Sequence, residues 1–108
     1  MWIVYCNEDY EEPTTLYGFR EDKDEAIRLA AEKFQERTMF SSFFGEMIWR
    51  DTYVCEYDGN DRKCLCGVED ISFSPTMEES FASATKEEYE HFKKLSTSEI
   101  IERYLVER

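Results

Sequence analysis

The sequence predicts a single α+β domain, residues 1–108, with helices packed on one face of a mainly antiparallel sheet. The chain has 108 residues, of which 42% are hydrophobic and 16% aromatic, so it can build one core but is too short for two. Short runs of β-forming residues and capped amphipathic segments follow one another along it, and no segment repeats. We expect the order β-β-α-β-β-β-α-α.

The first two elements are expected to be strands. Residues 1–6 are rich in β-forming side chains, and a polar run that ends at Pro13 follows them at once. This pattern is typical of a buried strand. A second, short strand is expected over residues 15–19.

The first helix is signalled by Asp22, with Glu25 three residues later. This spacing is typical of a capping box, in which the first side chain accepts from a free backbone N–H and the second reaches back to the cap. The helix should end near residue 37. Its apolar side, whose small residues would let it lie close to a sheet, consists of Ala26, Ile27, Ala30, Ala31 and Phe34.

Another side of this helix is acidic, because Glu25, Glu32 and Glu36 line up along it. The ordinary interpretation is a solvated face, since charged residues are almost always exposed. The functional interpretation is part of an acidic surface that binds a partner. The sequence leaves both open.

Residues 38–49 form an apolar segment that periodicity cannot assign to a buried turn or to the start of a strand. Aromatic residues and Met are enriched in interface cores, so exposed members of the segment would anchor a partner. The candidates are Phe43, Phe44 and Trp49. The alternative is ordinary core packing, because large apolar side chains are mostly buried.

The clearest hairpin signal in the chain is Asp-Gly-Asn-Asp between two β-rich runs, residues 51–57 and 62–66. With Gly-Asn as the two-residue loop, Cys55 lies opposite Cys64. With Asp-Gly as the loop, Cys55 lies opposite Arg62 instead.

A third β run, residues 68–73, should complete this part of the sheet, and the last third of the chain should be helical in two pieces. Thr85 with Glu88, and Ser96 with Glu99, each fit a capping box, so we expect a break near Ser96. The apolar stripes of the two helices are Tyr89, Phe92 and Leu95, and then Ile100, Ile101, Tyr104 and Leu105.

No motif for catalysis is visible. The four glycines are dispersed, whereas a nucleotide-binding loop needs them close together before a helix. His91 is the only histidine, and no spacing pairs it with a cysteine nucleophile. We therefore expect no enzyme, no catalytic residue and no cofactor.

The four cysteines, Cys6, Cys55, Cys64 and Cys66, allow three states. The last three could converge on one hairpin face and hold zinc with Cys6 or His91, but they lack paired C-x-x-C spacing. A Cys55–Cys64 disulfide is the second state, and buried free thiols are the third. We expect free thiols and no metal.

The chain carries 25 Asp and Glu against 13 Lys and Arg, a formal charge of −12. Direct binding to nucleic acid is not expected, because that binding replaces counterions with Lys and Arg. Anionic membrane surfaces are disfavoured for the same reason, and no apolar stretch approaches the ~20 residues that span a bilayer. Because no basic region precedes the first apolar run, we expect no export signal and a cytoplasmic protein.

Two functions fit this composition. The first is a non-enzymatic inhibitor or adaptor whose carboxylates mask a basic surface of a partner protein, such as a nuclease or another nucleic-acid-binding protein. In composition the chain is similar to small acidic proteins of phages and mobile elements, which include inhibitors of CRISPR and restriction nucleases, although it shares no motif with any one family.

The second is a small regulatory or structural protein that binds a partner through the aromatic residues between positions 40 and 49. A charge of −12 exceeds the magnitude of ~2–8 that keeps small domains soluble, which favours the first function. The partner's identity and the oligomeric state stay open.

Overall fold

The computed structural model describes residues 1–6, 15–57, 71–81 and 83–107. It confirms the α+β class and the antiparallel sheet. The elements of the described part are β1 (Trp2–Cys6), β2 (Thr15–Arg20), α1 (Lys23–Arg37), β3 (Met39–Ser41), β4 (Glu46–Ile48), β5 (Thr52–Glu56), β6 (Ile71–Phe73), α3 (Met77–Phe81), α4 (Lys86–Lys94), α5 (Thr97–Tyr104) and β7 (Leu105–Glu107).

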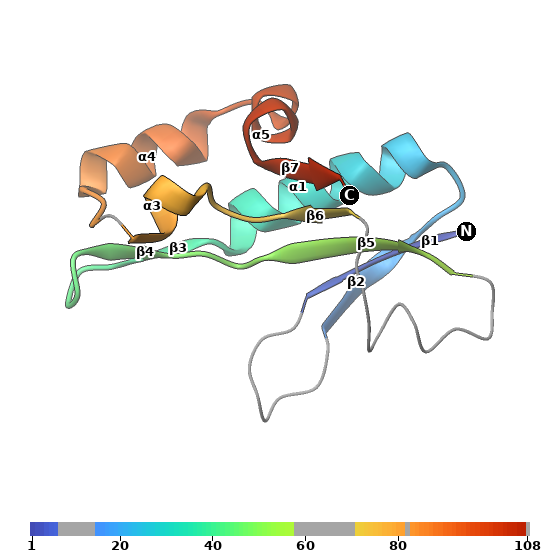
Figure 1. Ribbon diagram of the computed structural model, residues 1–108, viewed down its shortest axis with the longest axis horizontal. Coiled ribbons are helices and arrows are strands. Elements are labelled where there is room, and N and C mark those ends of the chain that lie inside the picture. The colour runs from blue at the N-terminus through green and yellow to red at the C-terminus, as the bar shows by residue number, and fades with distance from the viewer. Residues whose placement is uncertain (7–14, 58–70, 82, 108) are drawn as a thin grey trace.

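The main sheet has five strands in the order β2-β1-β5-β6-β7, and every neighbouring pair is antiparallel. Val4 of β1 pairs with Gly18 on one side and with Val54 on the other, so β1 lies inside the sheet. Figure 1 shows the helices gathered on one side of this sheet, with the β3–β4 hairpin extending beneath α4. The predicted placement of the helices on one face is therefore confirmed.

Helix α1 forms where the sequence predicts it. The Asp22 carboxylate accepts a hydrogen bond from the Glu25 backbone N–H at 3.1 Å. All five residues of the predicted apolar stripe are buried. Because three of them are alanines, the helix lies close to the strands, and Phe34 reaches the centre of the core.

The predicted break between the last two helices is also confirmed. α4 ends at Lys94 with Leu95 as its C-cap, and α5 begins after Ser96, whose side chain and backbone exchange hydrogen bonds with Glu99 in a complete capping box. At the start of α4 the Thr85 hydroxyl accepts from the Glu88 N–H at 3.1 Å. Local capping chemistry thus sets the beginning of each helix.

Three features differ from the prediction or go beyond it. The segment 38–49, left unassigned by its pattern, contains the β3–β4 hairpin. The short helix α3 was not predicted. Leu105, assigned to the last helical stripe, instead begins β7 and pairs with Phe73 at the edge of the sheet. That pairing joins residues far apart in sequence, so no local pattern indicates it.

The predicted hairpin of residues 51–57 and 62–66 is only partly within the described residues. Its first run is β5, which pairs with β1 and β6. Val54 pairs with Val4 on one side and with Ile71 on the other, so the prediction that residues 62–66 lie beside this run at Val54 is wrong. The predicted turn and partner run lie outside the described residues, as does the start of the run predicted at 68–73.

The core centres on an aromatic cluster that joins α1 to the C-terminal helices. The Phe34 ring lies 5.8 Å from Trp49, 5.8 Å from Phe92 and 5.4 Å from Tyr104, measured between ring centroids. A smaller cluster, which contains Ile3, packs on the other face of the sheet. Trp49, which the sequence analysis names as a candidate for partner binding, is half-buried because it packs on the main core beside Phe34.

Candidate functional site

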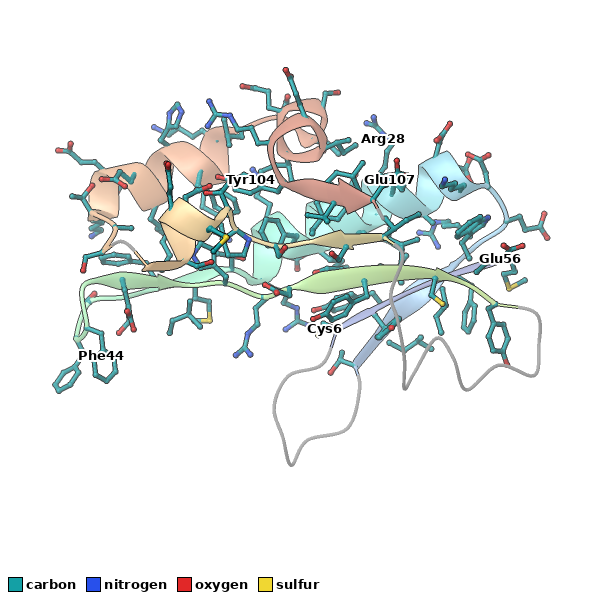
Figure 2. All side chains as sticks on the ribbon, viewed as in Figure 1. Cys6, Arg28, Phe44, Glu56, Tyr104 and Glu107 are labelled. Carbon is teal, nitrogen blue, oxygen red and sulfur yellow. The ribbon has the colours of Figure 1, made fainter. Side chains whose placement is uncertain are left out.

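The most exposed aromatic residues of the described chain lie at the tip of the β3–β4 hairpin. Phe43 is 88% exposed and Phe44 is 68% exposed. Their rings contact each other edge to face with centroids 4.9 Å apart. Figure 2 shows Phe44 projecting from the end of the hairpin, away from the helices.

The turn that presents these rings is held by the backbone and by Ser41. The Gly45 N–H donates to the Ser41 carbonyl at 2.8 Å, and the Phe44 N–H donates to the Ser41 hydroxyl at 3.2 Å. Gly45 has a φ of +64°, a conformation that glycine adopts without strain. The tip is therefore a defined turn.

The base of the hairpin is fixed on the rest of the fold. Phe40 stacks on Tyr89 of α4 with ring centroids 5.7 Å apart, and Met47 packs on the main core. On the opposite face of the hairpin, Met39 and Ile48 are cross-strand partners, 56% and 41% exposed. We call the four exposed apolar side chains of this hairpin the hairpin patch: Met39, Phe43, Phe44 and Ile48.

The acidic line on α1 is exposed as expected, but basic residues interrupt it. Glu25, Glu32 and Glu36 all reach solvent. Lys33 forms an ion pair with Glu36 at 3.3 Å. The Lys93 ammonium from α4 approaches the same end of the helix and donates to the Glu36 backbone carbonyl at 3.0 Å. The surface formed by these glutamates therefore carries both positive and negative charges at the C-terminal end of α1.

A cavity of about 560 Å³ opens between α3, α4 and α5. Trp49, Phe92 and Tyr104 contribute aromatic surface to its lining. Three carboxylates line it as well, from Glu79 on α3 and from Glu87 and Glu88 on α4. Its remaining charged or titratable groups are His91 and Arg103.

Within this cavity Tyr104 and Glu79 are hydrogen-bonded. The Tyr104 hydroxyl donates to Glu79 Oε2 at 2.9 Å, and the Thr76 hydroxyl donates to Glu79 Oε1 at 2.8 Å. Burial, followed by the hydrogen bond to Glu79 and its negative charge, raises the pKa of Tyr104 to about 12. The phenol therefore stays protonated at neutral pH and orients the carboxylate.

Sequence reasoning named the three aromatic candidates but missed Glu79 and the cavity. The cavity is assembled from three helices that are separated in the chain, and α3 was not predicted. A sequence signal did exist for part of the cavity, because the N-cap residues Thr85 and Ser96, each with a Glu three positions later, mark the starts of α4 and α5.

The cysteines and the histidine are distributed over separate elements. Cys6 is a buried free thiol in β1 that accepts a hydrogen bond from the Tyr17 hydroxyl at 3.0 Å. Cys55 is disulfide-bonded, which corrects the expectation of a free thiol there, and its partner lies outside the described residues. The sequence alone could not decide between these states because each depends on long-range pairing. His91 is exposed on α4.

Within the described ranges no three His, Cys, Asp or Glu side chains gather in a group that could hold a metal ion. None of the helices described is both long and apolar enough to cross a membrane. No protein-family model, no curated protein and no solved structure matches this chain.

Proposed function

We propose that this protein is a non-enzymatic protein-binding module that docks on its partner through the hairpin patch. The single observation that carries the proposal is the exposure of two adjacent phenylalanines, Phe43 at 88% and Phe44 at 68%, at a defined turn. Both rings lie mostly in solvent, outside the core of the fold. They suit a partner protein with an apolar pocket.

The size of the patch fits this role. Burial of a Phe side chain contributes about 1.5–3 kcal/mol, so two rings in one pocket would make the energetic centre of an interface. The stacking of Phe40 on Tyr89 fixes the hairpin base, and Gly45 defines the turn. Because the rings are presented on an ordered support, docking would cost little conformational entropy.

The charge of the chain indicates the kind of surface around that pocket. A formal charge of −12 favours a basic partner and accelerates its association. Such a partner includes nucleases and other nucleic-acid-binding proteins. Charge governs the encounter, and the hairpin patch governs how long the complex lasts.

A second candidate function is masking of a nucleic-acid-binding surface by carboxylates, as in a nucleic-acid mimic. It is supported by the exposure of Glu25 and Glu32 on α1 together with the net charge. The ion pair between Lys33 and Glu36 makes α1 a weaker anionic surface than the sequence suggests. The hairpin patch is therefore the better supported anchor.

Affinity capture from the host lysate with four baits separates the two functions. The baits are the native chain, F43S/F44S, E25K/E32K/E36K, and the control Met77→Ser, which removes a 78% exposed apolar residue elsewhere. The hairpin proposal expects a partner that only F43S/F44S loses and that moderate salt does not release. A partner that F43S/F44S retains, but that DNA, salt or the Glu reversals release, would favour masking instead.

A further inference from the structure

The cavity between α3, α4 and α5 is separate from the hairpin tip and has the form of a ligand site. Its volume of about 560 Å³ falls in the range of ~300–1,000 Å³ typical of small-molecule pockets. Its lining combines aromatic surface with a few charged groups, which is the usual composition of such pockets.

The aromatic lining suits a cation on an apolar stem. Trp49 lies 5.3 Å from Phe92 and 5.7 Å from Tyr104 between ring centroids, and these pairs are edge-to-face and tilted. Phe92 and Tyr104 are 3% and 5% exposed, so the half-buried Trp49 supplies most of the aromatic surface that a ligand can reach. The π face of an aromatic ring attracts cations and repels anions, most strongly for Trp.

The charged lining is predominantly negative. Glu87 and Glu88 from the first turn of α4, and Glu79 from α3, face one guanidinium, that of Arg103. Arg103 also interacts electrostatically with Glu99, which offsets part of its positive charge. The three carboxylates outnumber Arg103 and His91 together, so an anion entering the cavity would meet net repulsion.

One carboxylate is already oriented for a ligand. Glu79 accepts from the Thr76 hydroxyl through Oε1 and from the Tyr104 hydroxyl through Oε2. Each oxygen keeps a further lone pair, because an ionised carboxylate offers about four acceptor positions. The neutral donors fix the carboxylate without neutralising it.

We propose that this cavity binds an organic cation, an ammonium or guanidinium group carried on an apolar stem. The stem would lie against Trp49 and Phe92, and the charged group would be held by Glu79 with Glu87 and Glu88. The ligand is a free amine or the side chain of a Lys or Arg residue in a peptide, since both carry the same recognised chemistry.

The test is titration of the isotope-labelled protein, followed by NMR, with three ligands of one shape. Phenethylamine carries the cation, 2-phenylethanol is neutral, and phenylacetate is the anion. Phenethylamine should shift the Trp49 indole and His91 resonances until the shifts saturate. 2-Phenylethanol and phenylacetate should bind at least ~10-fold more weakly, a difference that corresponds to about 1.4 kcal/mol of binding free energy. Equal binding of all three ligands, or no binding of phenethylamine, would overturn the proposal.

Variants locate the charge interaction. Glu79→Gln and the pair E87Q/E88Q should each weaken the binding of phenethylamine about 10-fold or more, because each replaces the charged acceptors of the ammonium by neutral amides. Glu102→Gln, at an exposed position of α5, is the matched control and should change nothing. Unchanged affinity in both cavity variants would contradict the assignment.

Two further probes distinguish the sources. Nα-acetyl-lysine N-methylamide and Nα-acetyl-arginine N-methylamide present the side-chain cation on a peptide backbone. Tighter binding of either than of phenethylamine assigns the cavity to a peptide side chain, and weaker binding assigns it to a free amine. The cavity variants leave the hairpin patch unchanged. If the cavity does not bind cations, the proposal that the hairpin patch docks on a partner is therefore unaffected.

Discussion

Gln35 of α1 and Lys93 of α4 cap each other's helices. The Gln35 side-chain amide donates to the carbonyl oxygens of Leu95 at 2.7 Å, Phe92 at 3.0 Å and Lys93 at 3.3 Å. In return, the Lys93 ammonium donates to the backbone carbonyls of Gln35 and Glu36. Helix ends leave such carbonyls without intrahelical partners, so this exchange joins the C-termini of two helices.

Replacement of Gln35 by Ala should lower the free energy of unfolding by about 1–3 kcal/mol, since it removes the side-chain donor from the Lys93 and Leu95 carbonyls, whereas the Phe92 carbonyl keeps the Leu95 N–H. Urea denaturation measures the loss. Glu32→Ala, one turn earlier on the exposed face of the same helix, is the control and should stay within about 0.5 kcal/mol. Equal losses in the two variants would show that the capping exchange contributes no stability.

The Tyr104 phenol should make stability fall in alkali. Its pKa is raised to about 12 in the folded protein against 10.0 in the unfolded chain. The unfolded state therefore releases this proton first, and the contribution is complete below pH 10 and lost as the pH rises towards 12. Unfolding measured against pH for the native chain and Tyr104→Phe isolates it. If the difference in unfolding free energy between the native chain and Tyr104→Phe stays constant as the pH rises from 10 towards 12, this pH dependence does not come from Tyr104.

The exposed rings of the hairpin tip should be dispensable for folding. F43S/F44S should change the free energy of unfolding by no more than about 0.5 kcal/mol per site, because neither ring is buried. Phe34→Ala, at the centre of the core, should cost about 3–5 kcal/mol. Thermal unfolding of both variants is the measurement. A large loss in F43S/F44S would mean that the rings have a structural role.

Gly45 should be required for the geometry of the tip. Its φ of +64° strains any residue with a Cβ, although no heavy atom lies within 4 Å of the position a Cβ would take. Gly45→Ala should therefore cost about 1–2 kcal/mol through the backbone alone. Gly45→Asn should cost less, because Asn tolerates this conformation. Hydrogen exchange of the hairpin amides reports both effects, and identical exchange in the two variants would refute the explanation.

The parts of the fold that the sequence predicts are those controlled by local chemistry. Asp22 and Ser96 cap helices through bonds to residues three positions away, and Phe34 is buried by helical periodicity. The pairing of Leu105 with Phe73 is different, because it depends on where the chain returns after the three helices α3, α4 and α5. Neither residue's neighbours indicate that contact.

The candidate site also has features that the sequence predicts and features that depend on contacts between distant residues. Composition singles out Phe43 and Phe44 as candidates, but only the hairpin geometry shows that they are exposed while Trp49 packs on the core. Glu79 is one of 25 acidic residues, and nothing in its sequence context separates it from the others. Its role depends on Tyr104, which lies 25 residues further along the chain.

The affinity of the captured partner, measured at low and at moderate salt, tests the central claim most directly. For F43S/F44S we expect affinity to fall about 100-fold or more, as for the loss of an interface hot spot. Salt and the reversal of Glu25, Glu32 and Glu36 should have the smaller effect. An affinity that F43S/F44S leaves unchanged, but that salt or the Glu reversals abolish, would contradict docking through the hairpin patch.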